Sequence, residues 1–63
     1  MDAYANYPWR TGELVRAFHP LTLGVVRTGR IVRLGRKWVT VDFGELGGGT
    51  LRIARRDLVE PAA

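Results

Sequence analysis

Residues 24–43 constrain the fold of this 63-residue chain more than any other stretch. Val39, Val41 and Phe43 alternate with polar or mixed residues, so one face of this segment is wholly apolar, which is typical of a half-buried strand. Gly35 marks the reversal from a preceding β-branched segment, and glycine supplies the positive φ that hairpin turns need. The stretch therefore predicts two antiparallel strands joined by a tight turn at residues 35–37.

The same stretch also has a competing helical pattern. Its arginines recur every three residues from position 27 to position 36, as they would along one stripe of a helix. Gly24, Gly29 and Gly35 would each cost roughly 1 kcal/mol inside a helix relative to alanine. The five β-branched residues between positions 25 and 32 also disfavour a helix. We therefore prefer the hairpin.

Size and composition restrict the class of protein. A chain of 63 residues forms one small domain. It is near the lower limit for independent folding, because a chain this short buries only about 60% of the surface that it exposes when unfolded. It has no Cys and one His, so we expect no disulfide framework, no metal and no cofactor. No apolar run is long enough to span a membrane, and the N-terminus does not have the pattern of a signal peptide. We expect a soluble, cytoplasmic protein.

The basic residues are unevenly distributed. The formal net charge is +4, and five basic residues with no acid lie between Arg27 and Lys37. Residues 52–56 add a second cluster, whereas the acids are scattered singly. This pattern indicates an anionic partner. The alternative is a compositional origin, because nine of the ten basic residues are Arg, a skew that a high-GC genome can produce without selection for binding.

The segments on either side of the hairpin read as an arm and three further strands. Residues 1–11 show no periodicity and form an irregular arm, with Trp9 packed across an open end of the fold or, alternatively, stacked on bases. Residues 13–18 read as a strand whose inward face the pattern leaves open, and His19 lies in the following loop as a surface or packed residue rather than a catalytic one. Residues 44–49 form a hairpin loop rather than a phosphate-binding loop, because no helix follows them.

The remaining residues complete the predicted sheet. In the strand 50–54, Leu51 and Ile53 are expected to point inward and Arg52 outward. Residues 55–58 read as a helical turn closed by Leu58, and residues 59–60 as a last short strand. Residues 61–63 are expected to fray.

The order of these segments resembles the small SH3-like barrels of the KOW and Tudor type. The residues that carry the resemblance are Gly29-x-Ile31-x-x-Leu34, Val39-x-Val41-x-Phe43, Leu51-x-Ile53 and Arg56-Asp57-Leu58. Residues 14–20 with Gly24 are similar to the start of Tudor-like modules in certain bacterial helicases and transcription-coupling proteins. The resemblance implies an all-β fold, a single small five-stranded SH3-like barrel over residues 12–60 with an irregular N-terminal arm. Such barrels bind DNA, RNA, RNA polymerase or other proteins. The chain departs from methyl-reading Tudor domains, because it has too few aromatic residues for a cage.

The sequence predicts a nucleic-acid-binding protein with weak sequence specificity and steep salt dependence, DNA being favoured over RNA. Trp38 lies on the outward parity of its strand and could stack on bases or wedge between them. Strand parity places Arg27 and Arg33 on the face opposite Arg30 unless a bulge near Gly29 changes the register. The residues ranked first are Arg30, Arg36, Lys37, Trp38 and Arg52. They are followed by Arg33, Arg27, Arg55 and Arg56.

The sequence also bears on two other functional classes, protein binding and enzymatic activity. A barrel that exposes Val32, Trp38 and arginines also suits an adaptor for RNA polymerase, a helicase or a mobile-element protein, or a self-associating subunit. The alternative to nucleic-acid binding is that Trp38 packs under the arm and the arginines are merely solvated. The chain has no Ser, no Cys, one His and scattered acids, so it offers no nucleophile–base pair and is expected not to be an enzyme.

Overall fold

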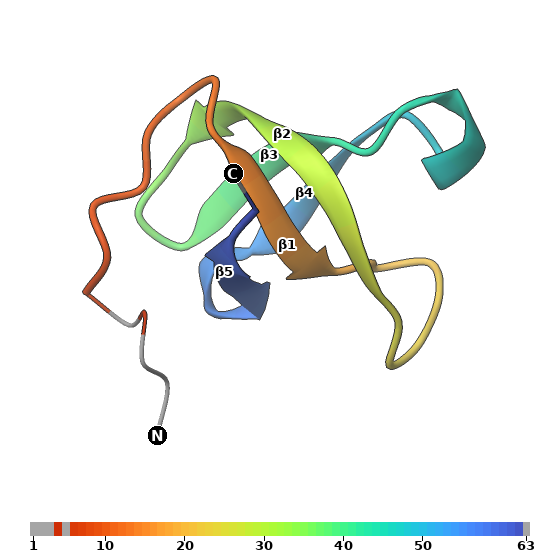
Figure 1. Ribbon diagram of the computed structural model, residues 1–63, viewed down its shortest axis with the longest axis horizontal. Coiled ribbons are helices and arrows are strands. Elements are labelled where there is room, and N and C mark those ends of the chain that lie inside the picture. Colours follow the sequence, from red (N-terminus) through yellow and green to blue (C-terminus); the bar gives the residue numbers. More distant parts are fainter. Residues whose placement is uncertain (1–3, 5, 63) are drawn as a thin grey trace.

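The computed structural model describes Tyr4 and residues 6–62, and these residues form a single antiparallel sheet (Figure 1). Its five strands are β1 (Leu14–Phe18), β2 (Val26–Leu34), β3 (Trp38–Asp42), β4 (Thr50–Ala54) and β5 (Leu58–Pro61), in the order β4-β3-β2-β1-β5. Single 3-10 turns, η1 (Glu45–Gly47) and η2 (Arg55–Asp57), join β3 to β4 and β4 to β5. The predicted all-β class, the five strands and the central hairpin are confirmed. No helix in this part of the chain has the length and apolarity needed to cross a membrane.

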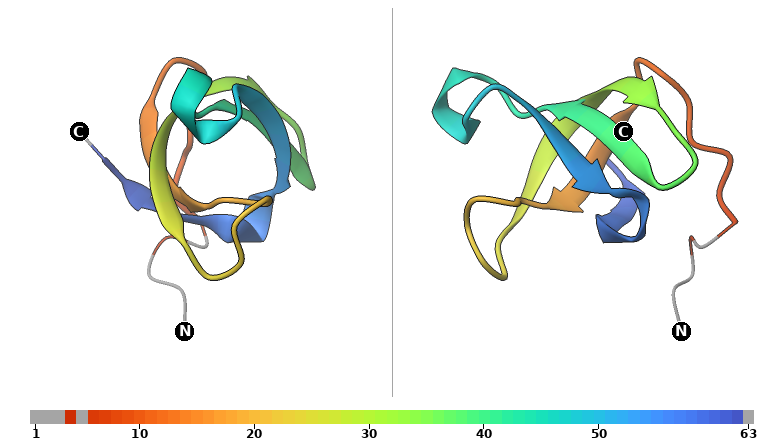
Figure 2. Two further views of the ribbon diagram at one scale, coloured as in Figure 1. Left: turned by 90° about the vertical axis from the view of Figure 1, so that its right-hand side faces the viewer. Right: turned by 180° about the vertical axis from the view of Figure 1, so that it is seen from behind.

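The sheet is strongly curved (Figure 2), and the side chains that its strands bury form the core. β1 contributes Val15 and Ala17, so the pattern that the sequence left open is resolved with Arg16 and Phe18 outward. Phe43, which was expected in the core, is half-buried and packs against it. The buried apolar residues of the core are Trp9, Val15, Ala17, Ile31, Val39, Val41, Ile53 and Leu58.

The β2–β3 turn needs glycine for a different reason from the one expected. Gly35 is not among the glycines with positive φ, so the predicted left-handed conformation at this position is wrong. Its N–H donates to the Trp38 carbonyl oxygen at 2.9 Å. A Cβ atom at this position would lie 2.7 Å from that oxygen. Glycine is therefore required by the close approach of the two backbones.

The N-terminal arm adds an aromatic cluster to the core. Trp9 is buried, and its ring centroid lies 4.5 Å from that of Tyr7 in an edge-to-face contact. Tyr4 in turn packs edge-to-face on Tyr7, with centroids 5.6 Å apart. The arm runs beside the β2–β3 turn in both figures (Figures 1 and 2). The expectation that Trp9 is packed is thus confirmed, while residues 1–3 and 5 lie outside the described residues.

The Tyr7 hydroxyl anchors the arm to the start of β1 by donating to Glu13 Oε2 at 2.6 Å. This hydrogen bond, more than desolvation, raises the pKa of Tyr7 above 10.0. A raised phenol pKa means that the contribution to stability is complete below the unfolded pKa and disappears as pH rises through the higher folded pKa. We expect Glu13→Gln in a Tyr4→Phe background to move the Tyr7 pKa back toward 10.0, as measured by phenolate absorbance. An unchanged midpoint would contradict the contact.

His19 joins the β1–β2 loop to η1 at the other end of the sheet. It is buried, and its Nε2 bonds to the Gly47 carbonyl oxygen, while Nδ1 accepts the Leu21 N–H at 3.2 Å. Because a carbonyl only accepts, Nε2 carries the proton. The imidazole also packs edge-to-face on Phe43, with centroids 4.8 Å apart. Its position in the structure is therefore that of a packed residue linking two loops.

The C-terminal end continues the pairing with β1. Pro61 pairs with Val15, and the Ala62 N–H donates to the Leu14 carbonyl oxygen at 3.0 Å. The fraying expected from residue 61 is therefore wrong for residues 61 and 62, because their backbones are held by β1. Residue 63 lies outside the described residues.

Candidate nucleic-acid interface

A bulge at Val32 decides which arginines of β2 share a face. Ile31 pairs with Val41 on β3, but the next pair is Arg33 with Thr40, so Val32 is the extra residue. A bulge shifts the alternation of a strand by one position. Arg33 consequently lies on the same outer face as Arg30. The sequence left open whether a bulge near Gly29 changes the register; the structure has a bulge three residues later, at Val32.

Trp38 stands on this outer face at the start of β3. It is 51% exposed, so the alternative in which it packs under the arm is wrong. Arg52 lies diagonally across on β4, opposite Thr40, and its guanidinium carbon lies 5.0 Å from the Trp38 ring centroid. This is a cation–π contact, worth about 0.5–1 kcal/mol at an exposed site. It holds a positive charge against the ring.

Two grooves meet at Trp38, which is the one described residue that both linings share. The turn groove has a volume of about 490 Å³ and is lined by Arg36, Lys37, Trp38, Ala54, Arg55 and Arg56. The strand groove has a volume of about 240 Å³ and is lined by Arg33, Leu34, Gly35, Trp38, Thr40 and Arg52. Neither lining contains an acid among the residues that the structure describes. We call the two grooves and the ring between them the Trp38 surface.

η2 is fixed to the β2–β3 turn by Arg55. Its backbone N–H donates to the Lys37 carbonyl oxygen at 2.8 Å, and its Nη1 donates to the Gly35 carbonyl oxygen at 2.9 Å. These two bonds hold together the two segments that form the turn groove. A guanidinium carries five N–H donors, so Arg55 can hold the groove and still reach an anion.

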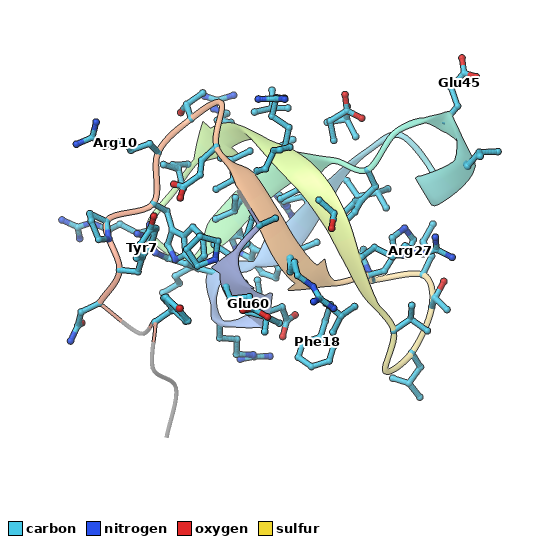
Figure 3. The ribbon with its side chains drawn as sticks, viewed as in Figure 1. Tyr7, Arg10, Phe18, Arg27, Glu45 and Glu60 are labelled. Atoms are coloured by element: carbon cyan, nitrogen blue, oxygen red, sulfur yellow. The ribbon has the colours of Figure 1, made fainter. Side chains whose placement is uncertain are left out.

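Two predicted site residues lie outside the Trp38 surface. Arg27 is near the β1–β2 loop, at the far end of β2 from the turn (Figure 3). Arg30 is on the outer face, but its Nη1 donates to the Gly12 carbonyl oxygen at 2.6 Å. Neither residue lines a groove beside Trp38. The structure brings together the other predicted residues, which are Arg33, Arg36, Lys37, Trp38, Arg52, Arg55 and Arg56.

Sequence reasoning missed Ala54 as part of this surface. Ala54 pairs directly with Trp38 across β3 and β4 and lines the turn groove. A larger side chain at this position would stand next to the indole ring. The signal was present in the alternation of residues 50–54, which places Ala54 on the same parity as Arg52. Recognising Ala54 as a site residue required the pairing of β3 with β4, which places Trp38 opposite it.

The Trp38 surface combines an exposed aromatic ring, two concave walls and a local excess of positive charge. No family model matches the chain, and no curated protein or solved structure shows significant similarity to it. The chemistry of the Trp38 surface is therefore the basis for inferring function.

Proposed function

We propose that this chain binds nucleic acid through the Trp38 surface, with DNA preferred to RNA and little dependence on sequence. The observation that carries the proposal is a half-exposed Trp38 between two grooves whose charged lining residues are all basic. Arginine and lysine neutralise phosphates, and contacts with the backbone carry no sequence information directly. The basic residues concerned are Arg33, Arg36, Lys37, Arg52, Arg55 and Arg56.

The clustering of these charges supports a polyanionic ligand over simple solvation. Basic side chains that line two adjoining grooves repel one another, and a bound polyanion relieves that repulsion. Concave walls also focus the positive potential toward the ring between them. Scattered surface arginines would produce neither effect.

We also propose that the curved sheet is an SH3-like barrel of the KOW and Tudor type. Its support is that five apolar positions of the matching motifs lie in the core, namely Ile31, Val39, Val41, Ile53 and Leu58. Two more, Leu34 and Phe43, are half-buried and pack against it. The turn η2 between β4 and β5 falls on the Arg56-Asp57-Leu58 motif. Small barrels of this kind include nucleic-acid-binding modules, which agrees with the chemistry of the Trp38 surface.

Fluorescence anisotropy with labelled random-sequence duplex DNA, single-stranded DNA and RNA across a salt series tests the proposal. We expect dissociation constants of about micromolar or tighter at low salt, with affinity falling steeply as salt rises. Arg36→Ala/Lys37→Ala should weaken binding and reduce the salt slope by up to about 1.8 for duplex or 1.4 for a single strand if both residues contact phosphates.

Arg16→Ala/Arg27→Ala is the matched control, because it also removes two positive charges, but from β1 and from the far end of β2. The substitution breaks the ion pair of Arg16 with Glu60, whose charged atoms lie 3.8 Å apart; the pair is exposed and is worth about 0–1 kcal/mol. We expect this variant to keep most of the affinity and the salt slope. Absence of binding at low salt, or equal losses in both double variants, would contradict the proposal.

A protein-binding function is the second candidate, favoured by the exposure of Val32. The bulge turns Val32 outward to 48% exposure, on the strand next to the half-exposed Trp38. Tryptophan and arginine are enriched in interface hot spots. A partner such as RNA polymerase, a helicase, a mobile-element protein or a second copy would bind with weak salt dependence. Sedimentation equilibrium at low and high salt tests the second copy directly.

A further inference from the structure

We propose that the ligand of the Trp38 surface is single-stranded nucleic acid, with one unpaired base stacked on the face of Trp38 that Arg52 leaves open. This inference rests on the proposed function and makes its ligand specific. It depends on the arrangement of Trp38, Arg52 and Ala54.

The contact with Arg52 makes Trp38 a platform and not a wedge. A side chain that inserts into duplex DNA separates two stacked bases and presents both of its faces to them. The Arg52 guanidinium lies 5.0 Å from the Trp38 ring centroid and belongs to the lining of the strand groove. One face of the ring is therefore taken by a cation, and the ring can stack on one base only.

The open side of the ring borders a space suited to a base. Arg52 does not line the turn groove, whereas Trp38 does. The residue paired with Trp38 across the sheet is Ala54, whose methyl group leaves room beside the indole. The groove volume of about 490 Å³ lies within the roughly 300–1,000 Å³ typical of small-molecule sites. A base in this groove would be surrounded by basic side chains that can reach the phosphates of the strand on either side of it.

Geometry favours a single strand over a duplex for this site. In a duplex the faces of the bases are covered by their neighbours, so a one-sided platform finds a free face only at an end or an unpaired position. In a single strand every base can offer a face, and proteins that bind single strands combine stacking aromatics with a basic groove along the backbone. Basic residues line both grooves beside Trp38, so phosphates on either side of the stacked base meet a positive charge.

An abasic oligomer separates base stacking from phosphate binding. We would measure anisotropy with labelled oligothymidylate, oligouridylate, an abasic deoxyribose–phosphate oligomer of equal length, and a blunt hairpin duplex with the same number of phosphates. Stacking of one base predicts that the protein binds oligothymidylate about 5- to 150-fold more tightly than the abasic oligomer.

Variants of Trp38 locate the effect. Trp38→Leu should abolish the preference for oligothymidylate over the abasic oligomer, and Trp38→Phe should restore part of that preference. Trp38 lies outside the core, so circular dichroism should report folded variants. Equal affinity for the oligothymidylate and abasic oligomers, or tighter binding of the duplex, would overturn the stacking inference and leave the proposed function standing. Absence of binding to all four ligands would overturn both.

Discussion

Trp9→Ala is expected to lower the free energy of unfolding by about 3–5 kcal/mol, the cost of truncating a buried tryptophan. Trp9 belongs to the N-terminal arm, is 7% exposed, and joins the core, where it packs edge-to-face on Tyr7. Domains of this size have little stability in reserve, because they bury a smaller fraction of their surface on folding than larger domains do. The variant should therefore be partly unfolded without denaturant. Urea titration followed by circular dichroism measures the change.

Trp38→Ala is the matched control for Trp9→Ala, because the chemical change is identical and the site is 51% exposed. We expect it to change the free energy of unfolding by roughly 1 kcal/mol or less, mainly through loss of the cation–π contact with Arg52. The two variants should thus separate stability from binding. A small effect of Trp9→Ala, similar to that of Trp38→Ala, would show that the arm does not contribute to the core.

Gly29→Val is expected to destabilise the protein by about 3 kcal/mol, the upper end of the cost of overpacking a core. Gly29 is buried in β2 opposite Val15. A Cβ atom there would lie 2.5 Å from Val41 Cγ1 and 2.9 Å from the Asp42 carbonyl oxygen. The side chain could move, but the backbone oxygen belongs to the β2–β3 pairing. Valine would therefore force the strands apart.

Thr28→Val provides the control for this substitution, since it adds the same side chain at the neighbouring exposed position of β2. We expect a change within about 0.5 kcal/mol, as for most surface substitutions. Thermal unfolding followed by circular dichroism compares the two. Equal unfolding temperatures for Gly29→Val and wild type would show that the space beside Val41 can accept a side chain.

The strands of this protein could be predicted because their evidence is local. Alternation in residues 38–43 and 50–54 marks β3 and β4, and the glycine at position 35 marks the turn between β2 and β3. Each of these signals depends on residues within a few positions of one another. The reason for Gly35 was nevertheless wrong, since close approach to the Trp38 carbonyl group is a property of two paired strands.

The composition of the candidate site was harder to predict, as Arg33 shows. Its parity in the sequence opposes that of Arg30, and the bulge at Val32 reverses this relation. The bulge is a property of the pairing between β2 and β3, so neither strand alone reveals it. Arg30 is one of the five residues that the sequence favours most as nucleic-acid contacts, yet it lies outside the grooves. Arg33 and Arg55 are less favoured by the sequence, yet they line the grooves.

The sequence by itself determined the all-β class, the hairpin, the buried positions of β3 and the basic character of the chain. Hydrophobic period and charge depend only on the identity and order of neighbouring residues. The tertiary structure decided which charges meet. Arg52 reaches Trp38 from β4, and Arg55 reaches the turn from η2, fourteen or more residues away along the chain. Register, bulge and curvature bring these side chains together, and all three arise from pairing between distant segments.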